Sequence, residues 1–106
     1  MPDQEALLHF RTVTLQIRRG KIDEAINLYK SVESEWKQRR GFVSAHLGIN
    51  RKSGEGISVS VWETLADLKE TESSGRVEDV MSRFGPMFPR QPILGTYEAV
   101  VTFRNG

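Results

Sequence analysis

His46 is the residue whose type and surroundings best suit acid–base chemistry. It is one of only two histidines in the chain. Its predicted neighbours in the sheet are small polar residues, including Ser44 on the same strand and Ser60 on the next. We interpret His46 either as a general base that takes a proton from a bound substrate or as a hydrogen-bonded histidine at an interface between two sheets. Hydrolysis by a serine–histidine pair is disfavoured, because no acid is suitably placed. The other histidine, His9, is expected to be exposed.

A second group of candidates is mostly apolar and could enclose a hydrophobic ligand. Met81 and Phe84 lie beside an expected helix break, and the alternative is that they are simply core residues. Trp62 ends a predicted strand and is either a pocket wall or an anchor between two subunits. Tyr97 either donates a hydrogen bond to a ligand or satisfies its hydroxyl at a sheet edge. The candidate ligand-binding residues are Trp62, Met81, Phe84, Tyr97 and Ser60.

The composition excludes several other kinds of site. The chain has no cysteine, so disulfides and thiolate metal sites are ruled out. No cluster of His, Asp and Glu has metal-ligand spacing, and no structural metal is expected. The net charge of +1 gives no reason to expect nucleic acid or an anionic membrane as a partner. No long apolar run and no signal peptide are evident, so a cytoplasmic location is expected.

The elements that must position these residues follow from hydrophobic periodicity. Four segments alternate apolar and polar residues with a period of two, which is typical of strands. These segments are residues 9–18, 42–50, 57–64 and 93–103. Residues 22–40 carry an apolar stripe at spacings of three and four, which predicts one helix that ends at Gly41. A second helix is expected to begin after Thr64, to break at Gly75 and to end at Gly85.

The two central strands are predicted to form a hairpin. Residues 51–56 supply a turn with two glycines that is otherwise polar. The expected register places Ile49 opposite Ile57, His46 opposite Ser60 and Ser44 opposite Trp62.

The order βαββαβ predicts a single α+β domain over residues 1–106, with residues 1–8 as a loose arm. Right-handed crossovers give the ferredoxin-like arrangement, a four-stranded antiparallel sheet of order 4-1-3-2 with both helices on one face. The odd-numbered aliphatic residues are expected to lie under the helices. The opposite face, roughly 440 Å² of sheet, is then bare and predicts a homodimer joined sheet to sheet. Its apolar residues would be Phe10, Phe42, Trp62, Leu94 and Val100.

Several motifs in this order resemble the antibiotic biosynthesis monooxygenase-like family of dimeric α/β barrels. They are the GF that opens the second strand, the glycine-bearing turn, and ISVSVWET running into LADL. The resemblance covers residues 9–103. It implies a barrel that serves cofactor-independent oxygenases of polycyclic phenols, quinone-forming enzymes, haem-degrading enzymes and proteins of no assigned activity.

The resemblance also bears on single residues. The family's tryptophan at the end of the third strand, which lines the cavity in several members, falls on Trp62. That cavity lies between sheet and helices, whereas simple alternation places Trp62 on the opposite face. The haem-degrading branch needs a histidine on the second helix, but residues 65–85 contain none, and its asparagine on the first strand is also missing. Haem chemistry is therefore disfavoured, and no cofactor is expected.

Together these observations predict a homodimeric barrel that binds a hydrophobic small molecule. It would be a cofactor-independent monooxygenase of an aromatic or phenolic compound, with His46 as the candidate catalytic base. The alternative is a non-catalytic binding protein or a stress-related dimer whose barrel is structural.

Overall fold

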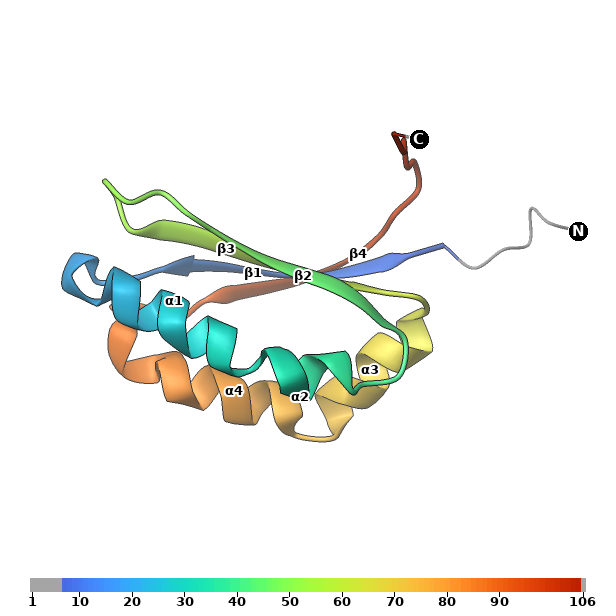
Figure 1. Ribbon diagram of the computed structural model, residues 1–106, viewed down its shortest axis with the longest axis horizontal. Coiled ribbons are helices and arrows are strands. Elements are labelled where there is room, and N and C mark those ends of the chain that lie inside the picture. Colours follow the sequence, from blue (N-terminus) through green and yellow to red (C-terminus); the bar gives the residue numbers. More distant parts are fainter. Residues whose placement is uncertain (1–6, 106) are drawn as a thin grey trace, which may run out of the picture.

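The computed structural model describes residues 7–105, which form one antiparallel sheet with helices on one of its faces (Figure 1). The strands are β1 (His9–Gln16), β2 (Phe42–Ile49), β3 (Glu55–Trp62) and β4 (Ile93–Glu98). Their spatial order is β2-β3-β1-β4, so the predicted order 4-1-3-2 and the α+β ferredoxin-like class are confirmed. Most of the arm expected at residues 1–8 lies outside the described residues.

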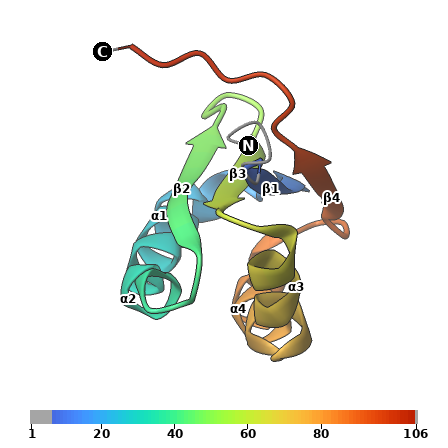
Figure 2. The ribbon, with the colours of Figure 1, turned by 90° about the vertical axis from the view of Figure 1, so that its right-hand side faces the viewer.

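The helices form two stacks that lie side by side beneath the sheet (Figure 2). One stack contains α1 (Ile22–Ser31) and α2 (Glu33–Lys37), and the other contains α3 (Leu65–Ser73) and α4 (Arg76–Phe84). Short 3₁₀ turns precede α1 and follow α4, at η2 (Arg19–Lys21) and η3 (Gly85–Met87). Each of the two predicted helices therefore consists of two shorter pieces.

The break between α1 and α2 corrects the prediction of one continuous helix over residues 22–40. Val32 leaves the helical conformation, with φ −95° and ψ 2°, and its side chain is buried. The Ser31 hydroxyl donates to the carbonyl oxygen of Leu28 at 2.6 Å, a contact that competes with helical hydrogen bonding and bends helices. The apolar stripe continues across this break, which is why periodicity alone does not reveal it.

The structure confirms the start expected at Thr64 and the break expected at Gly75. The Thr64 hydroxyl accepts a hydrogen bond from the amide of Asp67 at 3.0 Å, which caps α3. Gly75 separates the two helices with a φ of +84°, a conformation that favours glycine. Gly41 has a φ of +79° where the first stack ends. Its missing Cβ also makes room for Asp67, whose side chain would overlap a Cβ there.

The predicted register of the β2–β3 hairpin is wrong by one residue. Ile49 pairs with Gly56, His46 with Val59 and Ser44 with Val61. A bulge between Phe42 and Ser44 then brings Phe42 opposite Trp62. Because side chains alternate across a strand, a shift of one residue turns every side chain of β3 to the other face.

The assignment of faces is corrected accordingly. Trp62, Ser60 and Ser58 point toward the helices, on the same side of the sheet as Val13. Phe42 and Leu94 also lie on this side, because they pair with Trp62 and Val13. The other side, which we call the open face, carries the alternate residues of each strand, which point away from the helices. Its apolar members are Phe10, Ile57, Val59, Val61, Ile93 and Tyr97.

The last strand is shorter than the predicted segment 93–103, since β4 ends at Glu98. The Ala99 amide still donates to the carbonyl oxygen of Leu8 at 2.8 Å. Beyond it the chain leaves the sheet and extends away from the helices (Figure 1). Val100, Val101 and Phe103 are 72%, 70% and 93% exposed there, so most of the surface of these side chains is in contact with solvent.

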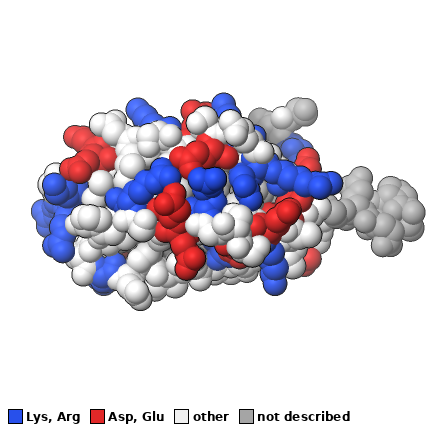
Figure 3. Space-filling view, turned by 90° about the horizontal axis from the view of Figure 1, so that it is seen from below, with Lys and Arg blue, Asp and Glu red and all other residues white. Residues whose placement is uncertain are grey.

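The hydrophobic core lies between the sheet and the helices. Ile17, Val32 and Leu68 are its largest fully buried side chains. The outer surface of the helices is covered by interspersed acidic and basic side chains (Figure 3), as expected of a face in water. The helix side is therefore charged, whereas the open face mixes apolar side chains with polar ones such as Thr12, Thr14 and Ser44.

Candidate functional site

A pocket lies between the helix-facing side of the sheet and both helical stacks. Its volume is about 70 Å³. β1 and β3 form its floor, α1 and α2 one wall, and α3 and α4 the other. The lining is mostly apolar, and a few polar side chains reach it; those are Arg11, Tyr29, Ser58, Ser60, Thr71 and Glu72. A largely apolar pocket with a few convergent polar groups is the usual form of a small-molecule site.

Trp62 forms one end of this pocket. It is 3% exposed, and its indole nitrogen donates to the Ser60 hydroxyl at 2.9 Å. The Trp36 ring, on α2, meets the indole edge-on with the ring centroids 6.4 Å apart. The Phe42 ring, on β2, also meets it edge-on, at a centroid distance of 5.5 Å. These contacts fix the orientation of the indole in the pocket wall.

Tyr29 of α1 reaches across to the floor of the pocket. Its hydroxyl is 2.9 Å from the Ser58 hydroxyl and 3.3 Å from the carbonyl oxygen of His46. Burial raises the pKa of Tyr29, and the hydrogen bond with Ser58 opposes that rise. The phenol is therefore held in its neutral form as a hydrogen-bonding group.

Arg11 and Glu72 form an ion pair at the pocket, between β1 and α3. The Arg11 guanidinium also donates to the carbonyl oxygen of Gly95 at 3.3 Å. Burial lowers the pKa of Arg11. This pair is the strongest charged feature of an otherwise apolar lining.

The residues proposed from the sequence divide between the two faces of the sheet. Trp62, Ser60, Met81 and Phe84 all line the pocket and are brought together. The Phe84 ring meets that of Tyr29 at 6.5 Å and stacks on that of Phe88 at 6.0 Å. By contrast, His46 and Tyr97 are exposed on the open face. Within one chain neither side chain is among those that line the pocket, although the carbonyl oxygen of His46 accepts from Tyr29.

The expectation for His9 is wrong. Its side chain is only 14% exposed, because it lies at the start of β1 on the helix-facing side, opposite Trp62. Its Nε2 atom is 4.0 Å from the Glu98 carboxylate. Its Nδ1 atom is buried and has no hydrogen-bond partner among residues 7–105.

The sequence interpretation missed Arg11, Tyr29 and Glu72 as pocket residues. Arg11 had a signal, because it falls on the odd-numbered face of β1, where it precedes the apolar Val13 and Leu15. A charged residue in an inward register is unusual. Glu72 had none, since it lies in the stretch of α3 that lacks apolar periodicity.

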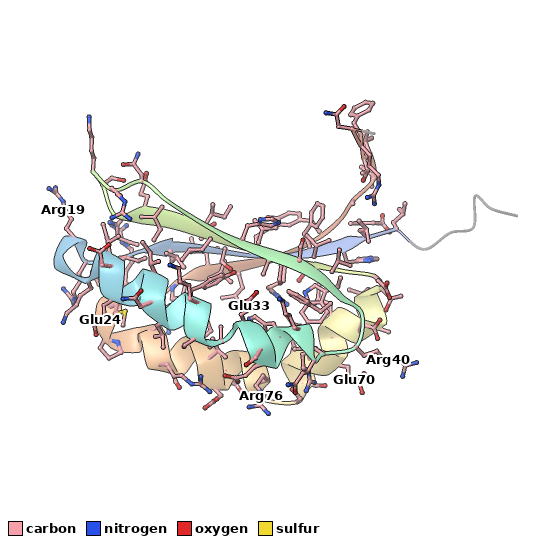
Figure 4. The ribbon with its side chains drawn as sticks, in the orientation of Figure 1. Arg19, Glu24, Glu33, Arg40, Glu70 and Arg76 are labelled. Atoms are coloured by element: carbon pink, nitrogen blue, oxygen red, sulfur yellow. The ribbon has the colours of Figure 1, made fainter. Side chains whose placement is uncertain are left out.

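Polar contacts on the outside tie the two helical stacks together over the pocket. Glu35 of α2 accepts from Arg83 at 3.1 Å and from Arg76 at 3.5 Å, both on α4. Arg39 donates to the Thr71 hydroxyl at 3.3 Å. Arg76, on α4, and Arg40, in the turn after α2, point outward (Figure 4). The pocket is thus closed by contacts between side chains, not by continuous backbone.

The sequence matches no protein-family model and no curated protein. Solved structures do match it. SnoaB, a cofactor-independent oxygenase from Streptomyces nogalater, superposes with a TM-score of 0.79 at 13% identity, over 94% of this chain and 100% of that one. A Bordetella bronchiseptica protein provisionally described as an antibiotic biosynthesis monooxygenase gives 0.76 at 13% identity, over 90% and 99%.

This is the antibiotic biosynthesis monooxygenase-like fold. The family resemblance read from the sequence is thereby confirmed at the level of the fold. A conserved protein from Methanosarcina mazei has the same fold, with a TM-score of 0.75 at 15% identity over 92% of this chain and 97% of that one. The monooxygenase-like fold alone does not determine an activity, so function must be argued from the pocket.

Within residues 7–105, no group of three His, Cys, Asp or Glu residues is arranged to hold a metal ion. In the same part of the chain, no helix is long and apolar enough to cross a membrane.

Proposed function

We propose that this protein binds a small aromatic molecule in the pocket between sheet and helices and acts on it as a cofactor-independent monooxygenase. The observation that carries the proposal is the pocket lining, in which aromatic walls meet a few polar groups. A phenol placed there would lie against Trp62 and Phe84, with its oxygen near Arg11, Tyr29 or the serines of β3. The fold shared with SnoaB, an oxygenase without a cofactor, supports the same class of reaction.

Such a reaction needs no external reductant. With 1-naphthol as substrate, one oxygen atom of O₂ enters the ring to give 1,4-naphthoquinone and the other leaves as water. The electrons come from the naphthol itself. The protein would have to bind the naphthol, favour its ionised form and keep bulk water away from it.

The size of the pocket sets a condition on binding. Its volume of about 70 Å³ is roughly half of the ~150 Å³ cavity that accepts benzene in an engineered protein. An aromatic ring therefore enters only when the walls move outward. The part that moves is the α3–α4 wall, because it contains the break at Gly75 and the flexible thioether of Met81. Contacts between side chains, not continuous backbone, join this wall to the other helical stack.

We also propose that the protein is a homodimer joined through its open face. Ile57, Ile93 and Tyr97 are 46%, 70% and 57% exposed on this face. The sheet alone offers roughly 440 Å², whereas a stable interface buries about 800 Å² per partner. The exposed Val100, Val101 and Phe103 extend away on the same side and supply further apolar area.

In such a dimer His46 would lie at the interface between the sheets. This position supports the interface role that the sequence left open for it. Its role as a general base stays a prediction, and it would require access to a pocket other than the one described above. The catalytic assignment is therefore tested separately from ligand binding.

The alternative function is ligand binding without turnover. It is favoured by one observation, that no histidine is among the residues that line the pocket. Both functions require the pocket, but only the first consumes oxygen.

The experiment is to incubate the purified protein with 1-naphthol in an oxygen electrode, without added metal or flavin, and to follow naphthoquinone by absorbance. Oxygen uptake with equimolar quinone is expected, and Trp62→Ala should abolish it. Ala66→Lys, on the outer surface of α3, is the control. Saturable quenching of tryptophan fluorescence without oxygen uptake would establish the alternative. Absence of both would refute the proposal.

A further inference from the structure

Arg11 places a guanidinium against a pocket whose lining is mostly apolar. Its side chain is only 14% exposed, and its neighbours on the same face of β1 are His9 and Val13. Arginine is rarely buried unless it is paired or used, because removing a cation from water is costly. The position therefore calls for a partner that compensates the charge.

The partners within the chain compensate it only in part. Arg11 is paired with Glu72 and donates to the carbonyl oxygen of Gly95 at 3.3 Å. Its Nε atom is buried and has no hydrogen-bond partner among residues 7–105. A guanidinium carries five N–H donors, so donor capacity remains. The lowered pKa of Arg11 has the same cause, since burial removes more hydration than the contacts replace.

Glu72 is held less firmly than Arg11. Its side chain is 29% exposed, so it can turn into water where Arg11 cannot. It lies in the last turn of α3, which contains no basic residue, and a carboxylate at this end of a helix opposes the helix dipole. The glycine break at Gly75 follows directly. Another anion could therefore take its place with little loss.

We propose that Arg11 selects the ligand of the pocket by binding an ionised oxygen attached to an aromatic ring, in the place of the Glu72 carboxylate. The inference rests on the proposed ligand-binding function and names the chemistry of its ligand. The ring packs against the aromatic walls. Its ionised oxygen accepts hydrogen bonds from the Arg11 N–H groups that faced Glu72. A phenolate and an aromatic carboxylate share this chemistry, and the experiment separates them.

The test compares two probes of nearly equal shape. 4-Nitrophenol forms a phenolate that absorbs visible light, whereas 4-nitroanisole has the same ring with its oxygen blocked by a methyl group. Binding beside Arg11 should lower the pKa of bound 4-nitrophenol by roughly one to three units, the usual effect of a close opposite charge. 4-Nitroanisole should bind more weakly, with no change in its spectrum.

Two variants assign the effect to the ion pair. Arg11→Leu with Glu72→Gln should keep the binding of 4-nitroanisole but lose the pKa shift of 4-nitrophenol. Glu72→Gln alone keeps the guanidinium and removes the competing carboxylate, so it should bind the phenolate several-fold more tightly than the wild type does. This single variant keeps the test decisive if the double variant does not fold.

The outcomes separate the inference from the function on which it rests. If neither nitro compound binds, the proposed pocket function fails, and this inference fails with it. If both bind equally and Glu72→Gln changes nothing, the pocket function stands and the role of Arg11 is refuted. If 4-nitrobenzoate binds in an Arg11-dependent way while the pKa of 4-nitrophenol is unchanged, the oxyanion is a carboxylate and the role of Arg11 holds.

Discussion

The rings of Trp36 and Trp62 meet edge-on, with centroids 6.4 Å apart and an angle of 83° between their planes. Trp36 comes from α2 and Trp62 from the end of β3, so this contact joins one helical stack to the sheet. Both rings line the pocket. The same contact thus stabilises the fold and shapes the proposed binding site.

Replacing Trp62 by alanine should impair both stability and binding. Loss of a buried aromatic side chain costs about 3–5 kcal/mol, which chemical denaturation would measure. Trp62→Phe keeps a ring in the wall and should cost much less, although it loses the hydrogen bond to Ser60. If the alanine variant were as stable as the phenylalanine variant, the contact would not be a structural one.

Gly75→Ala should destabilise the protein through its backbone alone. A Cβ at Gly75 would meet nothing within 4 Å, but a φ of +84° costs an alanine about 1–2 kcal/mol. Gly20→Ala is the matched control, because its site is equally open and its φ is not positive. That variant should be unchanged or slightly more stable in thermal unfolding. Equal losses in both variants would contradict the role of φ.

Ile57→Lys should convert the proposed dimer into a monomer, because it places a charge in the middle of the open face. Light scattering coupled to size exclusion would report the mass. Ala66→Lys adds the same charge to the outer side of α3 and should leave the dimer intact. A monomeric wild-type protein at micromolar concentration would exclude the sheet-to-sheet dimer altogether.

His46→Ala should leave the binding of 1-naphthol unchanged, because His46 lies on the face of the sheet away from the pocket. If His46 acts only at the interface, turnover should also be retained and the dimer should dissociate more readily. Rates and dissociation constants measured side by side would decide. Normal binding with lost turnover would restore the general-base interpretation and contradict the interface role.

Tyr29 should make stability depend on alkaline pH. Its folded-state pKa is raised above the ordinary value of 10.0, chiefly by burial. Its contribution is therefore complete below pH 10 and is lost as the pH rises through the folded pKa. Urea unfolding of Tyr29→Phe should show a shallower loss above pH 10 than the wild type shows.

Tyr29→Phe should also cost about 0.5–1.5 kcal/mol at neutral pH, since it removes the hydrogen bond to Ser58. Tyr97→Phe, at an exposed tyrosine, is the matched control for removing a phenol. A loss of equal size in that variant would show that the contact with Ser58 is not the cause.

Much of the fold could be predicted because its signals are local. Alternation located all four strands, and Thr64 and Gly75 marked a cap and a break that the structure contains. The hairpin register was harder, because it depends on the loop. Asn50 accepts hydrogen bonds from the amides of Lys52 and Ser53, and this tight turn starts β3 at Glu55, two residues earlier than its apolar pattern suggests.

The site was less predictable, for a physical reason. On β3 the residues Ile57, Val59 and Val61 are apolar, yet they face away from the helices. Alternation separates two faces but does not say which one becomes the interior when an apolar face is also left open. The pairing of Arg11 with Glu72 joins residues far apart in the sequence, and no local pattern encodes it.

The short helices also determine which parts of the molecule open first. The four helices contain ten, five, nine and nine residues, and isolated helices of such lengths are marginal in water. They persist because they pack on the sheet, whereas β1 is hydrogen-bonded to strands on both sides. Amide hydrogens of α3 and α4 should therefore exchange with deuterium well before those of β1, and the pocket wall should unfold locally while the sheet remains intact.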